Sequence, residues 1–538
     1  MLKQEKSNKS VKNILPMILV ILDGWGLAKP SRGNATTLAK TPTINGLTRR
    51  YPNTRLFAHG KYVGLPPLQS GNSEAGHMNI GAGRIIEQDA VKISKSINDG
   101  TFFKNPAFME ALKHIKINQG KLHLMGMISN GMSAHSDPDH LLALLSLIKN
   151  RGLKEVYLHL FTDGRDSPRY ASLKLVQEIS RAFKNGEVIA TIIGRFYAMD
   201  RKKKWERTKK TYDALVNSRG KTAYSAEAAI TESYNRGEND EFIEPYIITA
   251  NGKPTPRISK GDSVILFNLR SDRARQLAKV FVQKDFCEIN KAYFVRKKLL
   301  KNLCFVAMTD FGPDLDSILT AYPSADLKET LPMILADVRQ LYIAETEKYA
   351  HVTYFFNGGY ASPVAGEARM VVPSPDVRSY DATPAMSSAK LTKEVVSNLT
   401  HNPLLSKERE NWKYDFTVLN YAAPDMLGHT GNLSAAITCC QQVDSFLGKV
   451  VKAYLKVGGT VLVTADHGNI EEMVNLKTGE INTEHSINQV PFILVNDLIK
   501  NKVKFRPDGV LGDIAPTILE LLEIRQPKEE MKGKSLLK

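Results

Sequence analysis

The sequence is poor in cysteine and contains no long apolar run. Its 538 residues include four cysteines, none spaced as Cys-x-x-Cys, which excludes the zinc sites built on such cysteine pairs and argues against a disulfide framework. We therefore expect a reducing, cytoplasmic location. No stretch reaches the roughly 18 to 20 apolar residues that a membrane-spanning helix requires, so we expect no membrane association.

The start of the chain also lacks the cleavage site of a signal peptide. Residues 1–13 are rich in Lys, Ser and Asn, which predicts a disordered tail. Residues 14–22 are mostly apolar, but they lead into Asp23-Gly-Trp with no small-residue cleavage site. We interpret this run as the first strand of a core.

Acidic residues are in deficit, with 56 against 73 basic residues and a formal net charge of +17. Such a balance is compatible with a nucleic-acid partner. However, the sequence contains no zinc-finger, RRM or KH signature and no basic segment interleaved with aromatic residues. We expect a solvated basic surface without a nucleic-acid partner, and we keep a basic nucleic-acid-binding protein as the remote alternative.

Strand-like and helix-like stretches alternate along the chain, which predicts an α/β fold with largely parallel sheets. In addition to the apolar runs that lead to aspartates, which are described in the next paragraph, the expected strands are 122–128, 156–161, 188–193, 264–268, 304–308 and 352–356. The expected helices are 139–149, 170–183, 391–399 and 435–455.

Three apolar runs end in an aspartate that has glycine close by. They are 18–22 before Asp23, 416–421 before Asp425, and the run from Val461 before Asp466. The carboxyl ends of strands are where sites form in open α/β sheets, so we expect these carboxylates to meet. Taken alone, each also fits a turn with a capping aspartate.

Three histidines lie in the same third of the chain as the later aspartates. They are His429, His467 and His485. Carboxylate and imidazole groups together suit a divalent ion such as Mn²⁺ or Zn²⁺. The alternative for Asp466-His467 is a surface turn, but the recurrence of the pattern favours a metal site.

Gly71-Asn-Ser73-Glu-Ala-Gly-His77 is the candidate nucleophile loop. A serine hydroxyl needs a base or a metal to become a good nucleophile, and the segment lacks the G-x-S-x-G spacing of hydrolase elbows. In isolation it also fits an ordinary polar turn. Together with Ser73, the expected ligands are too many for one ion, which predicts two ions and a metal-dependent phosphoryl or sulfuryl transfer.

The candidate ligands cluster at the two ends of the sequence, with Asp23 and Ser73 near the start and the others after residue 420. We therefore predict a discontinuous metal-binding domain, 14–88 with 323–538, and an inserted domain at 89–322. The chain would cross between the two domains at 88–92 and 321–327.

Expected strands of the insert also end in charged motifs. Five arginines follow them: Arg165, Arg195, Arg201, Arg270 and Arg273. Guanidinium groups match phosphate and carboxylate, so their shared position after strands predicts an anion pocket. Each one alone would equally fit a surface ion pair. Asp166 would bind substrate hydroxyls or order Arg165.

Taken in order, these motifs resemble the cofactor-independent phosphoglycerate mutases of the alkaline phosphatase superfamily, from about residue 15 to the end. The motifs are Leu-Asp23-Gly-Trp-Gly, Gly-Asn-Ser73-Glu-Ala-Gly-His, Asp-Gly-Arg165-Asp166, Gly-Arg195-Phe-Tyr, Asn-Leu-Arg270-Ser-Asp-Arg273, Glu-Lys348-Tyr, Pro-Asp425-Met-Leu-Gly-His429 and Thr-Ala-Asp466-His467-Gly-Asn. The segment Ser-Asn-Gly-Met-Ser-Ala-His135-Ser-Asp departs from the family pattern.

The resemblance implies an alkaline-phosphatase-like metal-binding domain and an inserted α/β transferase domain. It implies a monomer that converts 3-phosphoglycerate to 2-phosphoglycerate through a phosphoserine, without bisphosphoglycerate, in glycolysis and gluconeogenesis. The implied cofactors are two divalent ions, Mn²⁺ first and Mg²⁺ or Co²⁺ as alternatives.

The resemblance also implies a role for each site residue. One ion is held by Asp425, His429 and His485, and the other by Asp23, Ser73, Asp466 and His467. Ser73 takes the phosphoryl group, and Lys348 assists there. The substrate is held by His135, Arg165, Asp166, Arg195, Arg201, Arg270 and Arg273. The nearest alternative is another metal-dependent phosphomutase or phosphohydrolase of the same superfamily.

Overall fold

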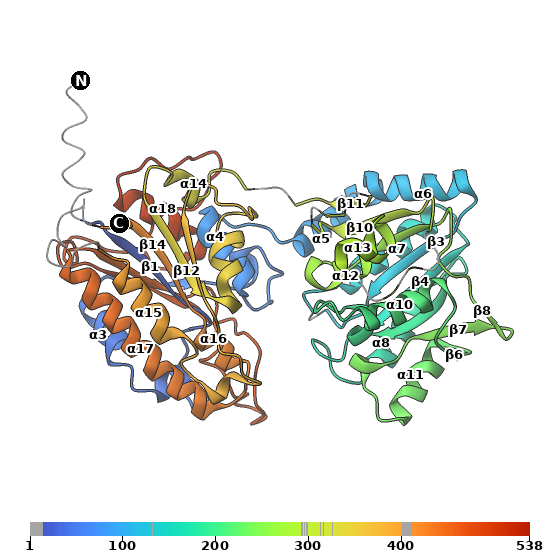
Figure 1. Ribbon diagram of the computed structural model, residues 1–538, viewed down its shortest axis with the longest axis horizontal. Helices are drawn as coiled ribbons and strands as arrows, with labels where there is room; N and C mark the ends of the chain where they lie inside the picture. The colour runs from blue at the N-terminus through green and yellow to red at the C-terminus, as the bar shows by residue number, and fades with distance from the viewer. Residues whose placement is uncertain are drawn as a thin grey trace, which may run out of the picture. The chain divides into compact units, whose positions relative to one another are not determined.

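The computed structural model describes residues 14–131, 133–291, 294, 296, 300–312, 314–315, 317–324, 327–400 and 412–538. The predicted tail at 1–13 lies outside the described residues. The chain divides into two compact units (Figure 1). The split unit comprises Met1–Gln88 and Ala325–Lys538, and the inserted unit is Asp89–Ser324.

The split unit is built on one sheet whose described strands run in the order β13-β12-β14-β1-β15-β16-β2-β17. β1 lies between β14 and β15 and is parallel to both, whereas β16 is antiparallel to both of its neighbours. The bounds are β1 (Met17–Leu22), β2 (Asn53–Phe57), β12 (Gln340–Glu345), β13 (Ala368–Val372), β14 (Phe416–Tyr421), β15 (Thr460–Thr464), β16 (Val490–Val495) and β17 (Gly509–Val510). β1 is apolar throughout and fully buried, as expected for a parallel strand covered on both faces.

Helices cover both faces of this sheet (Figure 1). The longest, α17 (Leu433–Lys456), begins at Asn432, whose side chain accepts a hydrogen bond from the Ala435 N–H. It buries an apolar stripe that includes Val443, Leu447 and Tyr454. The other helices are α2 (Ala35–Leu38), α3 (Pro42–Arg50), α4 (Ser73–Ala82), α14 (Leu331–Ile334), α15 (Ser388–Ser397), α16 (Ala423–Gly428) and α18 (Ile514–Leu521).

The inserted unit has its own sheet, in the order β11-β10-β9-β3-β4-β5-β7-β6, with β8 paired to β7. The strands from β11 to β5 are mutually parallel, and β7 runs antiparallel to β5. The bounds are β3 (Leu122–Met127), β4 (Val156–Thr162), β5 (Val188–Gly194), β6 (Lys221–Ala223), β7 (Tyr246–Ala250), β8 (Lys253–Pro254), β9 (Ser263–Leu266), β10 (Cys304–Thr309) and β11 (Leu319–Tyr322).

A hydrophobic core lies on each face of this second sheet. β3 illustrates the alternation, because Leu122 and Leu124 belong to one core and Met125 and Met127 to the other. The helices are α5 (Asp89–Asn98), α6 (Pro106–Asn118), α7 (Pro138–Asn150), α8 (Ser172–Ser180), α9 (Arg195–Ala198), α10 (Trp205–Val216), α11 (Ala226–Asn235), α12 (Ser271–Val282) and α13 (Phe286–Asn290). Among the described residues, no helix combines the length and the apolar character needed to cross a membrane.

The predicted α/β class with largely parallel sheets is confirmed, but the strand predicted at 352–356 is wrong. These residues form the helical turn η5 (His351–Phe355). Val352 and Phe356 are fully buried, while Tyr354 between them is 40% exposed. An apolar spacing of four residues is helical, and a short run of β-branched and aromatic residues does not distinguish a buried helical turn from a strand.

Candidate functional site

The three aspartates of the strand-end pattern meet at the carboxyl edge of the split unit's sheet. Asp23 follows β1, Asp466 follows β15, and Asp425 lies in α16, which follows β14. These strands are adjacent and parallel, so their carboxyl ends face the same edge. All three carboxylates are almost completely buried. Gly24 permits the close approach, since its φ is +72° and a Cβ there would lie 2.8 Å from the Asp425 Cα.

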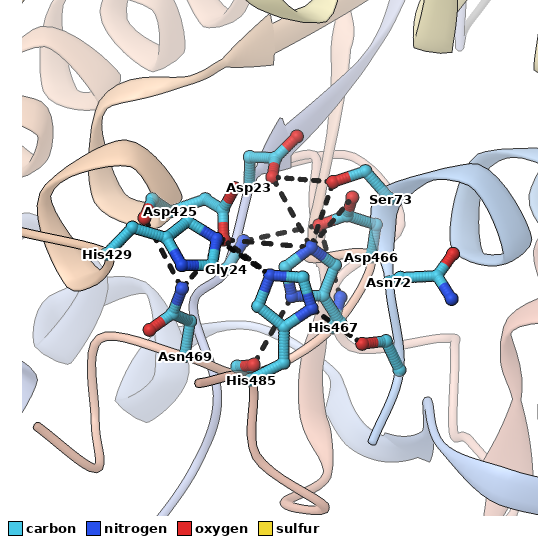
Figure 2. Close-up of polar contacts among 12 residues, drawn as sticks. Asp23, Gly24, Asn72, Ser73, Asp425, His429, Asp466, His467, Asn469 and His485 are labelled. Atoms are coloured by element: carbon cyan, nitrogen blue, oxygen red, sulfur yellow. Dashed lines mark hydrogen bonds and ion pairs between the residues drawn. The ribbon is translucent and has the colours of Figure 1, made fainter. Parts of the chain in front are cut away.

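The three predicted histidines surround these carboxylates. The Nε2 atoms of His429 and His485 lie 3.4 and 3.2 Å from Asp425 Oδ1. His467 Nε2 lies 3.6 Å from carboxylate oxygens of both Asp23 and Asp466. Figure 2 shows Asp425 and His429 at the left, Ser73 and Asp466 at the right, Asp23 above and His485 below, with His467 near the centre. Two groups of possible metal ligands result, namely Asp425 with His467 and His485, and Asp23 with Asp466 and His467.

Each of these imidazoles is oriented by a backbone carbonyl. The Nδ1 atoms face Thr483 O at 2.8 Å for His429, Gly468 O at 3.2 Å for His467, and Gly71 O at 2.7 Å for His485. A carbonyl accepts only, so Nδ1 carries the proton and Nε2 presents a lone pair.

The consequence is clearest between His429 and His485, whose Nε2 atoms lie 3.0 Å apart. Two lone pairs at that distance repel each other unless a cation lies between or beside them. Buried carboxylates and imidazoles held through their other nitrogen are the usual environment of a bound metal. The donor set therefore fits divalent cations.

Ser73 is the first residue of α4, and the Asn72 side chain caps this helix by accepting from the Ala75 N–H at 2.9 Å. Its Oγ lies 2.9 Å from His467 Nε2 and 3.2 Å from Asp23 Oδ1. Both partners accept, so the hydroxyl proton points into the carboxylate and imidazole cluster. The N-terminus of α4 favours negative charge at this position.

Lys348, in the turn η4 (Thr346–Lys348), supplies the ammonium group of this cluster. Its Nζ donates to Asp23, Ser73 and Asp425, at 2.7 Å each. Despite its burial, Asp23 and Asp425 raise the pKa of Lys348, so the group stays charged. Burial and the nearby Asp466 raise the pKa of Asp23, whereas Lys348 holds that of Asp425 well below its usual range in spite of burial.

Four further residues complete the cluster, and the sequence interpretation assigned no role to any of them. They are His77, Asn420, Asn469 and Glu471. His77 and Asn469 lie within quoted motifs, so their positions were a usable signal. Asn420 is embedded in an apolar strand, and Glu471 lies in an irregular segment, so neither had a local signal.

The predicted arginines of the inserted unit also follow parallel strands, and most of them are paired with aspartates. Arg195 is buried and donates to Asp163 and, at 2.8 Å, to Asp166. Asp272 pairs with Arg201 at 2.6 Å and with Arg270 at 3.6 Å. Two other residues of the predicted substrate site form hydrogen bonds with backbone groups. Arg273 donates to Met199 O at 3.3 Å, and His135 O accepts from the Leu269 N–H at 2.8 Å.

Electrostatics group these residues into one cationic cluster. Burial, Arg195 and Arg201 together lower the pKa of Arg273 to about 10. Burial and Arg270 lower the pKa of His135 to about 3, so this buried ring is neutral near pH 7. Arg165 stands apart, because its side chain is 58% exposed and lies 4.0 Å from Glu241.

Comparisons with known proteins agree over nearly the whole chain. Residues 93–313 match the family model described as the N-terminus of BPG-independent PGAM. The chain is 45% identical to a 2,3-bisphosphoglycerate-independent phosphoglycerate mutase of Clostridium kluyveri, over 97% of this chain and 99% of that protein. The corresponding protein of Moorella thermoacetica is 46% identical, over 97% and 98%. The structure of Leishmania mexicana phosphoglycerate mutase at low cobalt concentration superposes with a TM-score of 0.79 and 27% identity, over 97% of each chain.

Proposed function

The chain belongs to the family of the 2,3-bisphosphoglycerate-independent phosphoglycerate mutases, and we propose that it interconverts 3-phosphoglycerate and 2-phosphoglycerate in glycolysis and gluconeogenesis. The reaction needs no bisphosphoglycerate, because a serine of the enzyme carries the phosphoryl group between the two hydroxyls. The proposal includes a monomer in the cytoplasm.

The position of Ser73 is the observation that carries the proposal. Its hydroxyl donates toward His467 or Asp23, while Lys348 donates to the same oxygen at 2.7 Å. An ammonium group that close stabilises the oxygen as it loses its proton. Ser73 also begins α4, whose free N–H groups favour the negative charge of a phosphoryl group.

In the first step, Ser73 Oγ attacks the phosphorus of 3-phosphoglycerate, and the bond from phosphorus to the glycerate O3 oxygen breaks. The serine proton ends on that O3 oxygen, which leaves phosphoserine and glycerate. In the second step the glycerate O2 hydroxyl attacks the phosphoserine, the bond from phosphorus to Ser73 Oγ breaks, and the O2 proton returns to Ser73. The sum is an isomerisation with no net proton and no free phosphate.

We propose that the split unit holds two divalent ions, with Mn²⁺ as the first candidate and Mg²⁺ or Co²⁺ as alternatives. Asp425, His429 and His485 would hold one, and Asp23, Ser73, Asp466 and His467 the other. When bound, such ions lower the pKa of a hydroxyl that they contact and neutralise charge on phosphoryl oxygens. Lys348 would hold the phosphoryl group and the leaving oxygen through its ammonium hydrogens.

The arginine cluster of the inserted unit would bind the anionic substrate. Asp163 and Asp166 hold Arg195, and Asp272 holds Arg201, so these guanidinium groups are oriented before a ligand arrives. The residues proposed to hold the substrate are His135, Arg165, Asp166, Arg195, Arg201, Arg270 and Arg273. A neutral His135 would donate or accept one hydrogen bond without adding charge.

The test supplies 3-phosphoglycerate and Mn²⁺ without bisphosphoglycerate. Formation of 2-phosphoglycerate without free phosphate supports the mutase. Phosphate release alone would instead assign a phosphohydrolase, and salt-sensitive binding to random duplex DNA without any turnover would favour the nucleic-acid-binding alternative. Acid quenching during turnover should yield a phosphorylated peptide that contains Ser73.

A further inference from the structure

His77 and Asn420 are buried polar residues that the proposed chemistry does not use. His77 Nδ1 lies 2.9 Å from Ser73 O and 3.2 Å from Asp466 Oδ2. Asn420 Nδ2 lies 3.1 Å from His77 Nε2 and donates to Asp23 Oδ2 at 2.6 Å. Both side chains are fully buried. The pair therefore contacts Ser73 and both carboxylates of one proposed ion.

The hydrogen-bond partners fix the orientation of each group in this pair. Nδ1 of His77 faces two acceptors, so it carries the ring proton, and Nε2 is left as an acceptor. The Asn420 amide turns its NH₂ toward Asp23 and that ring nitrogen, because the amide oxygen would repel the carboxylate. The hydrogen bonds thus form one chain from Ser73 O through His77 and Asn420 to Asp23.

Asn469 and Glu471 form a second, separate chain. Asn469 Nδ2 donates to Asp425 Oδ1 at 2.8 Å. The carboxylate of Glu471 accepts from the Asn469 N–H and the Gly26 N–H, at 2.9 Å each. A Cβ on Gly26 would lie 2.2 Å from Glu471 Oε1, so the glycine leaves room for this carboxylate. This chain reaches a carboxylate of the other proposed ion.

We propose that these are two independent sets of positioning residues, one for each ion. His77 and Asn420 hold Asp23 and Asp466, and Asn469, whose backbone N–H Glu471 holds, positions Asp425. The inference rests on the proposed function, because it assumes the two cation sites assigned there. None of the four residues needs to contact substrate or cation.

The physical reason is the cost of holding carboxylates close together. Without outer hydrogen bonds, Asp23 and Asp466 would rotate apart, and a cation would have to reorder them on binding. Removing an outer partner of a metal ligand lowers metal affinity by about 10- to 100-fold. The two chains share no residue, but Lys348 donates to both Asp23 and Asp425, so a change in one chain should lower the affinity of its own site much more than that of the other.

The test measures Mn²⁺ binding to the full-length protein by equilibrium dialysis with metal analysis. The variants are Asn420→Ala, His77→Gln, Asn469→Ala and the double variant Asn420→Ala/Asn469→Ala. Asn79→Ala is the matched control. Asn79 is fully buried on the same helix as His77, but within the described part of the chain its side chain bonds only the backbone of Val63, Ala75 and Ile86. Thermal unfolding of each metal-free variant checks the fold.

We expect two bound ions in the wild type. Asn420→Ala and His77→Gln should lower the affinity for one ion about 10- to 100-fold and leave the affinity for the other within about twofold of the wild type. Asn469→Ala should lower the affinity for the ion at Asp425 by a similar factor. The double variant should lower the affinity for both ions. His77→Asn, which keeps a donor near the Nδ1 position, should restore part of the loss.

Three results would overturn the inference. They are unchanged binding in all variants, a double variant that keeps one ion at wild-type affinity, and an Asn79→Ala variant that loses as much as Asn420→Ala. Failure of the proposed function looks different. A wild type that binds two ions, shows the site-selective losses and yet makes no 2-phosphoglycerate would sink the mutase proposal and leave the positioning sets in place.

Discussion

The split and inserted units place their chemistry at the same topological position and give it opposite charge. In both, the polar residues follow parallel strands at the carboxyl edge of a sheet. In the split unit one lysine contacts two of the three buried carboxylates, and in the inserted unit arginines pair with a few aspartates. The parallel sheet edge thus fixes where a site forms, and the residues placed there fix whether it takes a cation or an anion.

The two sites also differ in how far they are sheltered from water. Asp23, Asp466 and His467 are fully buried, so any charge imbalance among them acts in a low dielectric. In the inserted unit the side chain of Arg201 is 51% exposed, whereas that of Arg195 is 2% exposed. Changes in the split unit should therefore act on chemistry and metal binding, and changes in the inserted unit should depend strongly on which arginine is altered.

The largest effect should come from Ser73→Ala. Removing a nucleophile that no neighbour replaces should lower kcat by at least about 10⁴-fold, while binding of 3-phosphoglycerate to the arginine cluster persists. Coupled-enzyme turnover and calorimetric binding measure the two quantities. Ser70→Ala, in the same loop, is the control. A Ser73→Ala enzyme that keeps full turnover would remove the serine from the mechanism.

Next in size is the contrast between Arg195→Ala and Arg165→Ala within the inserted unit. Arg195→Ala leaves the buried Asp163 without its cation, which should cost about 3 to 5 kcal/mol of unfolding free energy. Arg165 is mostly exposed, so its loss should cost less than about 0.5 kcal/mol and act on KM alone. Urea unfolding followed by circular dichroism tests this, and equal destabilisation by both changes would contradict it.

Removal of divalent ions should affect the two units unequally. The carboxylates of the split unit lose their counter-charge, whereas the inserted unit has none of the proposed ligands. Restoring Mn²⁺ at about 100 times its Kd should stabilise the split unit by about 2.7 kcal/mol for each occupied site. Hydrogen exchange with and without a chelator resolves the units, and a uniform change in both would argue against the assignment.

The smallest expected effect concerns His135 and pH. Its pKa of about 3 in the folded protein lies below the roughly 6.5 of an unfolded histidine. Between these values the unfolded chain binds the extra proton, so stability falls as the pH is lowered, by about 1.6 kcal/mol from pH 6.5 to pH 5. A His135→Asn variant lacks this contribution. Between pH 6.5 and pH 5 its free energy of unfolding, measured by urea titration, should therefore fall by that amount less than that of the wild type. Identical pH dependence in variant and wild type would contradict the lowered pKa, because a ring with the same pKa in both states adds no pH dependence.

Local sequence patterns predicted the strand ends, because an apolar run followed by Asp and Gly describes both a buried strand and its exit. The same reasoning failed at residues 352–356, where five residues fit a strand and a helical turn equally well. It could not find Asn420, which lies within an apolar strand and meets partners 397 and 343 residues away in the chain. Nor could it show that Asp163, quoted only as part of a motif, would hold Arg195. Pairings of this kind depend on the folded topology and leave no periodic trace.

The position of β1 between β14 and β15 has a consequence for synthesis on the ribosome. Met17 is registered with Phe416 on one side and Thr460 on the other, so this apolar strand is made about 400 residues before its neighbours. At roughly 5 to 20 residues per second, β1 waits some 20 to 80 s for them. The inserted unit is contiguous and is complete within that interval. The arginine site can therefore form while the nascent chain grows, and the serine site is assembled last, when the final strands emerge.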